Sequence, residues 1–331
     1  MKLLILSRVD LEKALPMEEA VAALEEAFRL YHEGKAAVPL RLPLETPRGV
    51  VLYMPAFLRD FRGAGALGGK VVSVYPGNPQ QSLPLIHALV LLNDPATGRP
   101  LALMEGAYLT GVRTGAASAV AAKYLARPQV KCLGLIGCGF QAFFQVQALC
   151  VVRPIERVVL FNRDPARAWD LKHRLEAELG LSAEVVEEVS ALTRQAEVLI
   201  TATTSKEPVF SGEEVQPGTT AIAIGAFTPD ARETDDVLVR RARIYVDAYE
   251  GALAEAGDLL IPMERSVLQR EGIQGELGEL VTGKVPGRQH EDEIVLFKSV
   301  GLAIEDAAAA AAAYQNALKQ GLGTEVELDD R

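Results

Sequence analysis

The residues from 130 onward alternate between short apolar runs and longer segments with helical spacing. The apolar runs lie at 130–136, 157–161, 197–201, 219–225 and 243–248, and helical patterns lie at 141–150, 165–179 and 190–195. Strands joined by single helices are typical of βαβ units, in which the strands lie parallel in one sheet. The pattern therefore predicts a doubly wound α/β domain built on a parallel sheet.

The residues before 130 follow a different pattern. Apolar residues recur at helical spacing over 16–33, and 107–126 is a second long helix of small residues. Between 38 and 105, short apolar runs are separated by Pro and Gly pairs, which favours antiparallel strands and turns. The Ala-rich segment 299–319 is expected to form one helix with close packing contacts.

These two patterns predict two domains. We expect one domain to comprise residues 1–118 together with 300–331, with the parallel α/β domain, 119–299, inserted between its two parts.

Charge and composition exclude several classes of function. The net charge of −10 leaves no excess of Lys and Arg to neutralise nucleic-acid phosphates. The apolar run in MKLLILSRVD is too short for a secretory signal, and no apolar stretch approaches membrane-spanning length. Three cysteines without paired spacing fit a reducing compartment, and the four histidines show no metal-ligand spacing to them. We expect a soluble cytoplasmic protein without a metal site.

The stretch GLIGCGFQA, residues 134–142, contains the pattern Gly-x-Gly-x-x-Ala. It follows an apolar run and precedes a helical pattern, which is the context of a dinucleotide-binding turn. Gly137 would permit the tight turn, and Gly139 would let a pyrophosphate approach the helix N-terminus. The alternative is that the stretch is an ordinary strand-to-helix turn of an α/β domain.

The end of the next apolar run bears on which dinucleotide would bind. NAD-binding proteins usually carry Asp or Glu there to bind the ribose 2′-hydroxyl, whereas this chain has Asn162, followed by Arg163 and Arg167. An amide and two guanidinium groups favour a 2′-phosphate. Asp164, which precedes Pro165, is expected to cap the following helix. NADPH is therefore favoured over NADH.

Three cations upstream stand alone in apolar or small-residue segments: Arg41 in VPLRLPL, Lys70 in LGGKVVSVYP and Arg113 in LTGVRTGAAS. Buried cations are costly unless they are paired. Each could simply pair with a structural carboxylate. Together, and beside a redox domain, they indicate a site for a substrate that carries a carboxylate.

The chain resembles the ornithine cyclodeaminase/mu-crystallin family over nearly its whole length. The similar segments are VPLR at 38–41, GGKVVSVYPGN at 68–78, LLNDPATGRPLALMEGAYLTGVRTGAASAVAAKYLA at 91–126, GLIGCGFQA, GELGELVTGKVPGR at 275–288 and VLFKSVGLAIEDAAAA at 295–310. The resemblance implies a Rossmann domain and a substrate-binding and dimerisation domain, the latter formed by the N-terminal part and the last helix. It also implies NAD- or NADP-dependent chemistry on amino and imino acids, or cyclisation of ornithine to proline. Arg41, Lys70 and Arg113 match positions that hold the substrate carboxylate, with Lys70 close to the reacting carbon.

Two departures from the cyclodeaminase pattern favour the mu-crystallin-like branch. Cyclodeaminases carry a Glu two residues before a Met-Pro pair, where this chain has Leu52, and an Asp after the fifth Rossmann strand, where it has Phe227. Cyclisation of ornithine needs polar groups for proton transfer, which these side chains lack. Asp230 could substitute as the acid, or it could cap a turn.

The sequence thus favours a homodimeric NADPH-preferring reductase of α-imino acids (ketimines) such as Δ1-pyrroline-2-carboxylate. We expect Lys70 and Asp230 to serve in catalysis and Arg41, Lys70 and Arg113 to bind the substrate. The expected cofactor-binding residues are Thr114, Gly137, Gly139, Phe140, Gln141, Asn162, Arg163, Arg167, Thr203 and Ser205. Two alternatives stay open: an ornithine cyclodeaminase that uses NAD, and a non-catalytic protein that binds NADPH and a carboxylate ligand.

Overall fold

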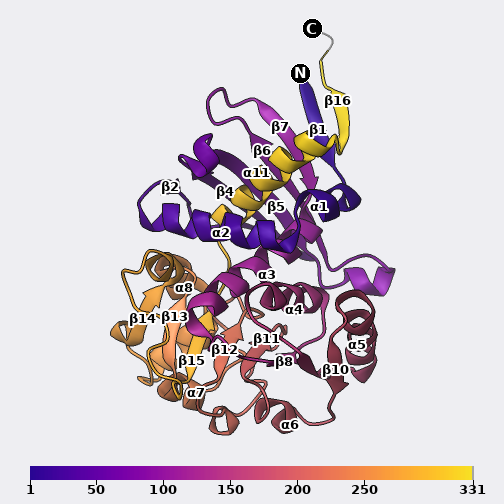
Figure 1. Ribbon diagram of the computed structural model, residues 1–331. Helices are drawn as coiled ribbons and strands as arrows, with labels where there is room; N and C mark the ends of the chain where they lie inside the picture. Colours follow the sequence, from indigo (N-terminus) through magenta and orange to yellow (C-terminus); the bar gives the residue numbers. More distant parts are fainter. Residues whose placement is uncertain (330–331) are drawn as a thin grey trace. The chain divides into compact units, whose positions relative to one another are not determined.

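The computed structural model describes residues 1–329. The chain divides into two compact units (Figure 1). The first comprises Met1–Arg113 and the C-terminal segment from Leu302, and the second comprises Thr114–Gly301. The boundary on the N-terminal side falls within the long helix α3 (Gly106–Leu125).

The second unit contains an eight-stranded sheet in which every pairing is parallel. Its strands are β8 (Cys132–Ile136), β9 (Arg157–Phe161), β10 (Ser182–Val185), β11 (Val198–Thr201), β12 (Thr220–Ala223), β13 (Arg243–Val246), β14 (Ile273–Glu276) and β15 (Val295–Lys298). Their order is β10-β9-β8-β11-β12-β15-β13-β14. The predicted parallel α/β sheet is therefore confirmed. The direction of winding reverses between β8 and β11, and the carboxyl ends of strands at such a switch point are where ligands of this architecture bind.

Helices connect these strands. They are α4 (Phe140–Val152), α5 (Pro165–Leu179), α6 (Val189–Thr193), α7 (Asp236–Arg241), α8 (Tyr249–Glu255), α9 (Gly257–Glu264) and α10 (Leu277–Val281). Helix α5 shows how local sequence sets their limits. The Asp164 side chain accepts a hydrogen bond from the Ala166 N–H at its start, and Gly180 ends it with a φ of 66°. Asp164 is thus a helix cap, as the sequence predicted.

The first unit is built on a mixed sheet in the order β16-β1-β7-β6-β5-β4-β2, with β3 paired to β4. Its strands are β1 (Lys2–Leu6), β2 (Ala36–Ala37), β3 (Leu42–Thr46), β4 (Gly49–Leu58), β5 (Ala66–Val74), β6 (Ile86–Asn93), β7 (Pro100–Glu105) and β16 (Thr324–Glu327). Neighbouring strands are antiparallel except β1 and β7. The antiparallel strands expected between residues 38 and 105 are present.

Three helices accompany this sheet: α1 (Arg8–Ala14), α2 (Met17–His32) and α11 (Ala303–Gln320). Helices α2 and α11 lie across one face of the strands (Figure 1). The alanines at 307–313 are all buried. A Cβ on Gly68 of β5 would lie 3.8 Å from the Cα of Ala307, so small side chains on both partners permit close packing.

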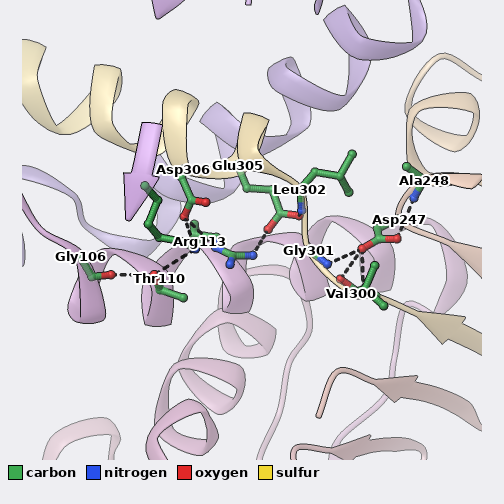
Figure 2. Close-up of polar contacts among 12 residues, drawn as sticks. Gly106, Thr110, Arg113, Asp247, Ala248, Val300, Gly301, Leu302, Glu305 and Asp306 are labelled. Atoms are coloured by element: carbon green, nitrogen blue, oxygen red, sulfur yellow. Dashed lines mark hydrogen bonds and ion pairs between the residues drawn. The ribbon is translucent and has the colours of Figure 1, made fainter. Parts of the chain in front are cut away.

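The last helix begins later than residue 299, where the sequence placed it. The buried carboxylate of Asp247 accepts a hydrogen bond from the Ser299 hydroxyl. It also accepts from the N–H groups of Val300 and Gly301 (Figure 2). Gly301 also has a φ of 81°. These contacts hold residues 299–301 in a non-helical conformation, so α11 starts at Ala303.

The opposite face of the mixed sheet exposes a row of apolar side chains. Leu42, Tyr53, Val71 and Leu89 stand opposite one another across β3, β4, β5 and β6. Their exposed fractions are 65%, 42%, 42% and 52%. We call these four residues the outer row.

Over residues 1–329, no helix has both the length and the apolar character that crossing a membrane requires.

Candidate functional site

Lys70 and Arg113 lie in a buried ionic cluster with two acidic residues of α11. Figure 2 shows Arg113 between the two carboxylates, Glu305 and Asp306. The Lys70 Nζ is 3.0 Å from the Asp306 Oδ1, and the Arg113 Nε donates to the same oxygen at 3.1 Å. The Arg113 Nη1 donates to the Glu305 Oε2 at 2.6 Å. Two cations from β5 and α3 thus meet two carboxylates of α11, which lie between 192 and 236 residues further along the chain.

The position of each charge follows from its element. Lys70 is on the helix-covered face of β5, where its strand neighbours are Met54 and Val90. Its ammonium also lies 3.4 Å from the hydroxyl of Thr110. Glu305 accepts a hydrogen bond from the Leu302 N–H at 2.9 Å, so its carboxylate caps α11 as well as binding Arg113.

Burial and charge act differently on the two cations. Burial, followed by the nearby charge of Arg113, lowers the pKa of Lys70 to about 8, against the opposing effect of Asp306. For Arg113, burial also acts to lower the pKa, but Asp306 and Glu305 outweigh it and hold the pKa above its usual value. Arg113 is therefore a permanent cation, whereas Lys70 changes charge near neutral pH.

The pairing of both cations with carboxylates matches the structural alternative considered from the sequence. One feature distinguishes the cluster from a closed ion pair. The Asp306 Oδ2 is buried and has no hydrogen-bond partner within residues 1–329. A buried carboxylate oxygen without a donor is costly, so the cluster has capacity for a polar group of a ligand.

Arg41 is half-buried in the segment between β2 and β3. The register pairs Leu42 with Tyr53, which places Arg41 at the level of Met54, the residue opposite Lys70. The sheet therefore brings Arg41 to the same level as Lys70, while Lys70 and Arg113 both contact the Asp306 Oδ1.

In the second unit, the glycine motif forms the turn from β8 into α4. Gly137 has a φ of 98°, and a Cβ there would lie 2.6 Å from the Ala202 oxygen. Only glycine fits this position. Around Gly139, by contrast, a Cβ would meet nothing within 4 Å, and α4 begins there without a side-chain cap. A helix N-terminus without a side-chain cap and with open space beside Gly139 suits a pyrophosphate.

The two residues after Gly139 flank the same turn. Phe140 is about half exposed, at 52%. The Gln141 Oε1 is buried without a hydrogen-bond partner within residues 1–329.

At the end of β9, Asn162 has protein partners of its own, although the sequence assigned it to a cofactor 2′-phosphate. The Asn162 Oδ1 accepts a hydrogen bond from the Cys138 N–H at 3.0 Å, and its Nδ2 donates to the backbone carbonyl oxygen of Asp164 at 2.9 Å. The Asn162 amide therefore supports the glycine turn. Arg163 and Arg167 are exposed, and the Arg167 Nε lies 3.6 Å from the Asp164 carboxylate.

The sequence analysis missed Glu233, which joins the loops after β11 and β12. Its buried carboxylate accepts hydrogen bonds from the N–H groups of Thr203 and Gly225, both at 2.7 Å, and from Ala226 at 3.3 Å. Burial is the main cause that raises its pKa. Nothing in the local pattern ARETDD separates this residue from its acidic neighbours.

Two further buried charges support Glu233. The Asp258 Oδ1 accepts from its backbone N–H at 2.8 Å. The Lys298 ammonium lies 2.8 Å from the Asp258 Oδ2 and donates to the Ala226 oxygen at 2.6 Å. Strand ends β11, β12 and β15 are thereby fastened together at the edge of the sheet that receives ligands in this architecture.

Thr203 and Ser205 belong to the loop held in this way. The Thr203 Oγ1 accepts from the Ser205 N–H at 3.2 Å, and the Ser205 hydroxyl donates to the Glu207 oxygen at 2.7 Å. Thr114 is half-buried at the point where α3 enters the second unit.

Asp230 is not placed as a buried acid. It is exposed, its Oδ2 is 2.6 Å from the Lys206 ammonium, and its Oδ1 accepts from the Thr228 hydroxyl. These hydrogen bonds, first that from Lys206, lower its pKa to about 2. It is ionised at neutral pH, which argues against Asp230 as a proton donor.

The two departures from the cyclodeaminase pattern have clear surroundings. Leu52 is buried and points to the same face of β4 as Met54, which stands opposite Lys70. Phe227 is 38% exposed in the loop after β12. Neither position offers a proton-transferring group.

Within residues 1–329, no three or more His, Cys, Asp or Glu side chains gather in a way that could hold a metal ion.

Comparison with known proteins gives consistent matches. Residues 1–321 match the model of the ornithine cyclodeaminase/mu-crystallin family. The structure of Thermococcus litoralis Δ1-pyrroline-2-carboxylate reductase in complex with NADH and L-proline is similar, with 46% identity, a TM-score of 0.94 and coverage of 98% of this chain and 100% of that one. An archaeal alanine dehydrogenase dimer with bound NAD has 39% identity and a TM-score of 0.92, covering 99% and 100%. A Δ1-pyrroline-2-carboxylate reductase of Bacillus cereus is 36% identical, over 98% of this chain and all of the relative.

Proposed function

The chain belongs to the ornithine cyclodeaminase/mu-crystallin family, and from this premise we propose that it is an NAD(P)H-dependent reductase of α-imino acids. The observation that carries the proposal is the buried cluster of Lys70, Arg113 and Asp306, combined with apolar residues at both positions where cyclodeaminases are polar. We propose Δ1-pyrroline-2-carboxylate as the substrate, because two similar proteins are Δ1-pyrroline-2-carboxylate reductases. One of them is in complex with L-proline, the product of this reduction.

The residues of this chain divide the work as follows. Arg113 and Arg41 bind the substrate carboxylate through charge-assisted hydrogen bonds. The Lys70 ammonium orients the substrate and keeps the imine nitrogen protonated, which makes the imine carbon a better acceptor. When bound, a nicotinamide cofactor would supply the hydride. The turn at Gly137 and Gly139 holds the pyrophosphate, and Glu233 fixes the loop of Thr203 and Ser205.

We assign NADPH as the preferred cofactor, with NADH as a second cofactor. The similar solved structures contain NADH or NAD. In this chain, however, no carboxylate takes the place of Asn162 to accept a hydrogen bond from a ribose 2′-hydroxyl, and Asp164 is used as a helix cap. The exposed Arg163 and Arg167 provide positive charge for a 2′-phosphate.

A homodimer is part of the same proposal. The alanine dehydrogenase relative is a dimer. The outer row of Leu42, Tyr53, Val71 and Leu89 offers a second copy a flat apolar surface on the mixed sheet. Apolar surfaces of this kind are typical of subunit interfaces.

An assay with three arms, carried out on dialysed protein, tests the function. One arm follows NADPH oxidation with Δ1-pyrroline-2-carboxylate, and a second follows ammonia release from L-ornithine with NAD⁺. A third arm, pyruvate with ammonia, tests the linear imino acid that the alanine dehydrogenase relative suggests. Turnover in the first or third arm and none in the second is expected. Proline and ammonia from ornithine would overturn the proposal, and the absence of turnover in every arm would favour a binding protein.

A further inference from the structure

Asp306 occupies the junction of the buried cluster. Its Oδ1 accepts hydrogen bonds from the Lys70 Nζ at 3.0 Å and from the Arg113 Nε at 3.1 Å. Its side chain is completely buried, and its Oδ2 has no donor within residues 1–329. Neighbouring Glu305 is just as buried but contacts Arg113 and the Leu302 N–H. The two adjacent acids share Arg113 but differ in their second partner, which is Lys70 for Asp306 and the Leu302 N–H for Glu305.

We propose that Asp306 is a positioning residue that holds Lys70 and Arg113 side by side as the cationic receptor for the substrate carboxylate. This inference rests on the proposed function, since it assigns how that substrate is received. Glu305 has a different role, which is to cap α11 and to fix the guanidinium of Arg113 from one side.

The electrostatic reason is the repulsion between the two cations. In a buried site with little water, two neighbouring cations repel each other. Without a shared counter-ion they would move apart, or one of them would lose its proton. A shared carboxylate oxygen removes this repulsion and fixes the distance between them. Because both donors use the same Oδ1, the second oxygen remains available to the protonated nitrogen of an imino or amino acid.

Groups from α3, β4, β6 and α11 surround the Lys70 side chain. Thr110 and Arg113 approach from α3, Met54 and Val90 flank it on β4 and β6, and α11 contributes Asp306 with Glu305 behind it. Asp306 is the carboxylate in direct contact with the ammonium. Loss of its charge is therefore expected to lower the pKa of Lys70, by about one unit or more. Loss of the more distant charge of Glu305 should lower it by less.

The test compares Asp306→Asn with Glu305→Gln, which is a matched change on the adjacent buried residue. The direct readout is an NMR titration of protein labelled at the lysine ¹³Cε, in which the Lys70 signal is assigned by its loss in Lys70→Arg. We expect Asp306→Asn to shift the midpoint to lower pH by about one unit or more and Glu305→Gln to shift it by less than half of that. Equal shifts, or no shift in Asp306→Asn, would overturn the proposal.

A kinetic readout separates positioning from general damage. In Asp306→Asn, the KM for the imino acid should rise at least about tenfold and the alkaline limb of the kcat/KM profile should move to lower pH, while the Kd for NADPH stays unchanged. The NMR titration needs no turnover. A wild-type protein that reduces no imino acid but shows the expected titration would therefore refute the proposed function and not the role of Asp306.

Asp306→Glu covers the case in which the asparagine variant does not fold. It keeps the negative charge but moves the carboxylate, so the pKa of Lys70 should stay within about half a unit of wild type while substrate affinity falls. Wild-type affinity in Asp306→Glu would overturn the proposal, because the position of the oxygen would then be unimportant.

Discussion

At Lys70, burial and charge act on a single ammonium group. Burial, followed by the charge of Arg113, lowers its pKa from 10.5 to about 8, and in the proposed mechanism the ammonium form orients the substrate and keeps the imine nitrogen protonated. We therefore expect kcat/KM for an imino acid to be constant below pH 8 and to fall about tenfold per unit above it. A rate profile between pH 6 and 10 with a pH-independent substrate checks this, and a flat profile to pH 10 would contradict it.

The shifted pKa of Lys70 affects the stability of the fold in the opposite direction from its effect on activity. The unfolded chain binds a proton at Lys70 up to pH 10.5, whereas the folded chain releases it from about pH 8. Between these values the unfolded state holds more protons, so the contribution of Lys70 to the free energy of unfolding increases with pH. Loss of activity above pH 8 should therefore not be accompanied by unfolding that originates from this residue.

Replacing Lys70 with Met separates catalysis from cofactor binding. The variant keeps most of the side-chain volume but removes the charge that orients the substrate and protonates the imine. We expect kcat/KM to fall by about a hundredfold or more. The enhancement of NADPH fluorescence on binding should persist, since Lys70 belongs to the unit that lacks the glycine turn. Full turnover in Lys70→Met would remove Lys70 from the mechanism.

Arg163 is the residue whose loss should reveal the cofactor preference. It is exposed beside the end of β9. We expect Arg163→Ala to weaken NADPH binding about tenfold and to leave NADH binding nearly unchanged, because only the former carries a 2′-phosphate. Titrations of both nucleotides with wild type and variant check this. Equal losses for the two would refute the assignment.

Residue types alone identified part of the cluster. Lys70 and Arg113 stand out in the sequence because each interrupts an apolar or small-residue segment. Their partner Asp306 is separated from Lys70 by 236 residues, so the pairing depends on tertiary structure that no local pattern encodes. Glu233 was missed for a similar reason: its function is to accept backbone N–H groups from two loops, and backbone donors leave no mark on the sequence.

At the scale of elements, local patterns were informative where strands follow one another in the chain. The segments 157–161 and 165–179 were placed with the bounds that β9 and α5 have. Strands β10, β14 and β15 were not anticipated. The first two are four-residue strands toward the two edges of the sheet, and β15 enters between β12 and β13 after a long excursion of the chain. Polar residues interrupt the apolar run in β10 (SAEV) and β14 (IQGE), and non-local pairing leaves β15 outside the local alternation.

The turn from β8 to α4 gives a prediction with an internal control. Gly137 has a φ of 98°, and a Cβ on it would clash with the backbone oxygen of Ala202. Gly139, in contrast, faces open space. Gly137→Ala should reduce the free energy of unfolding by about 1–3 kcal/mol and abolish NADPH binding. Gly139→Ala should unfold at close to the wild-type Tm but bind NADPH more weakly, because its Cβ enters the space for the pyrophosphate. Thermal melts and NADPH titrations distinguish the two, and equal Tm values would contradict the packing argument.

At the scale of the whole molecule, the outer row is the surface through which we expect two copies of the chain to associate. An apolar row on the exposed face of four paired strands loses hydration on contact with a second copy, and a charge placed in the row would stay buried and unpaired. We expect Leu89→Lys to convert the proposed dimer into a monomer of 35.6 kDa. Val9→Lys is the matched control, because Val9 is 58% exposed on α1, outside the sheet. Light scattering after size exclusion measures both masses. A Leu89→Lys variant that stays dimeric would mean that another surface joins the subunits, while dissociation of both variants would point to general destabilisation.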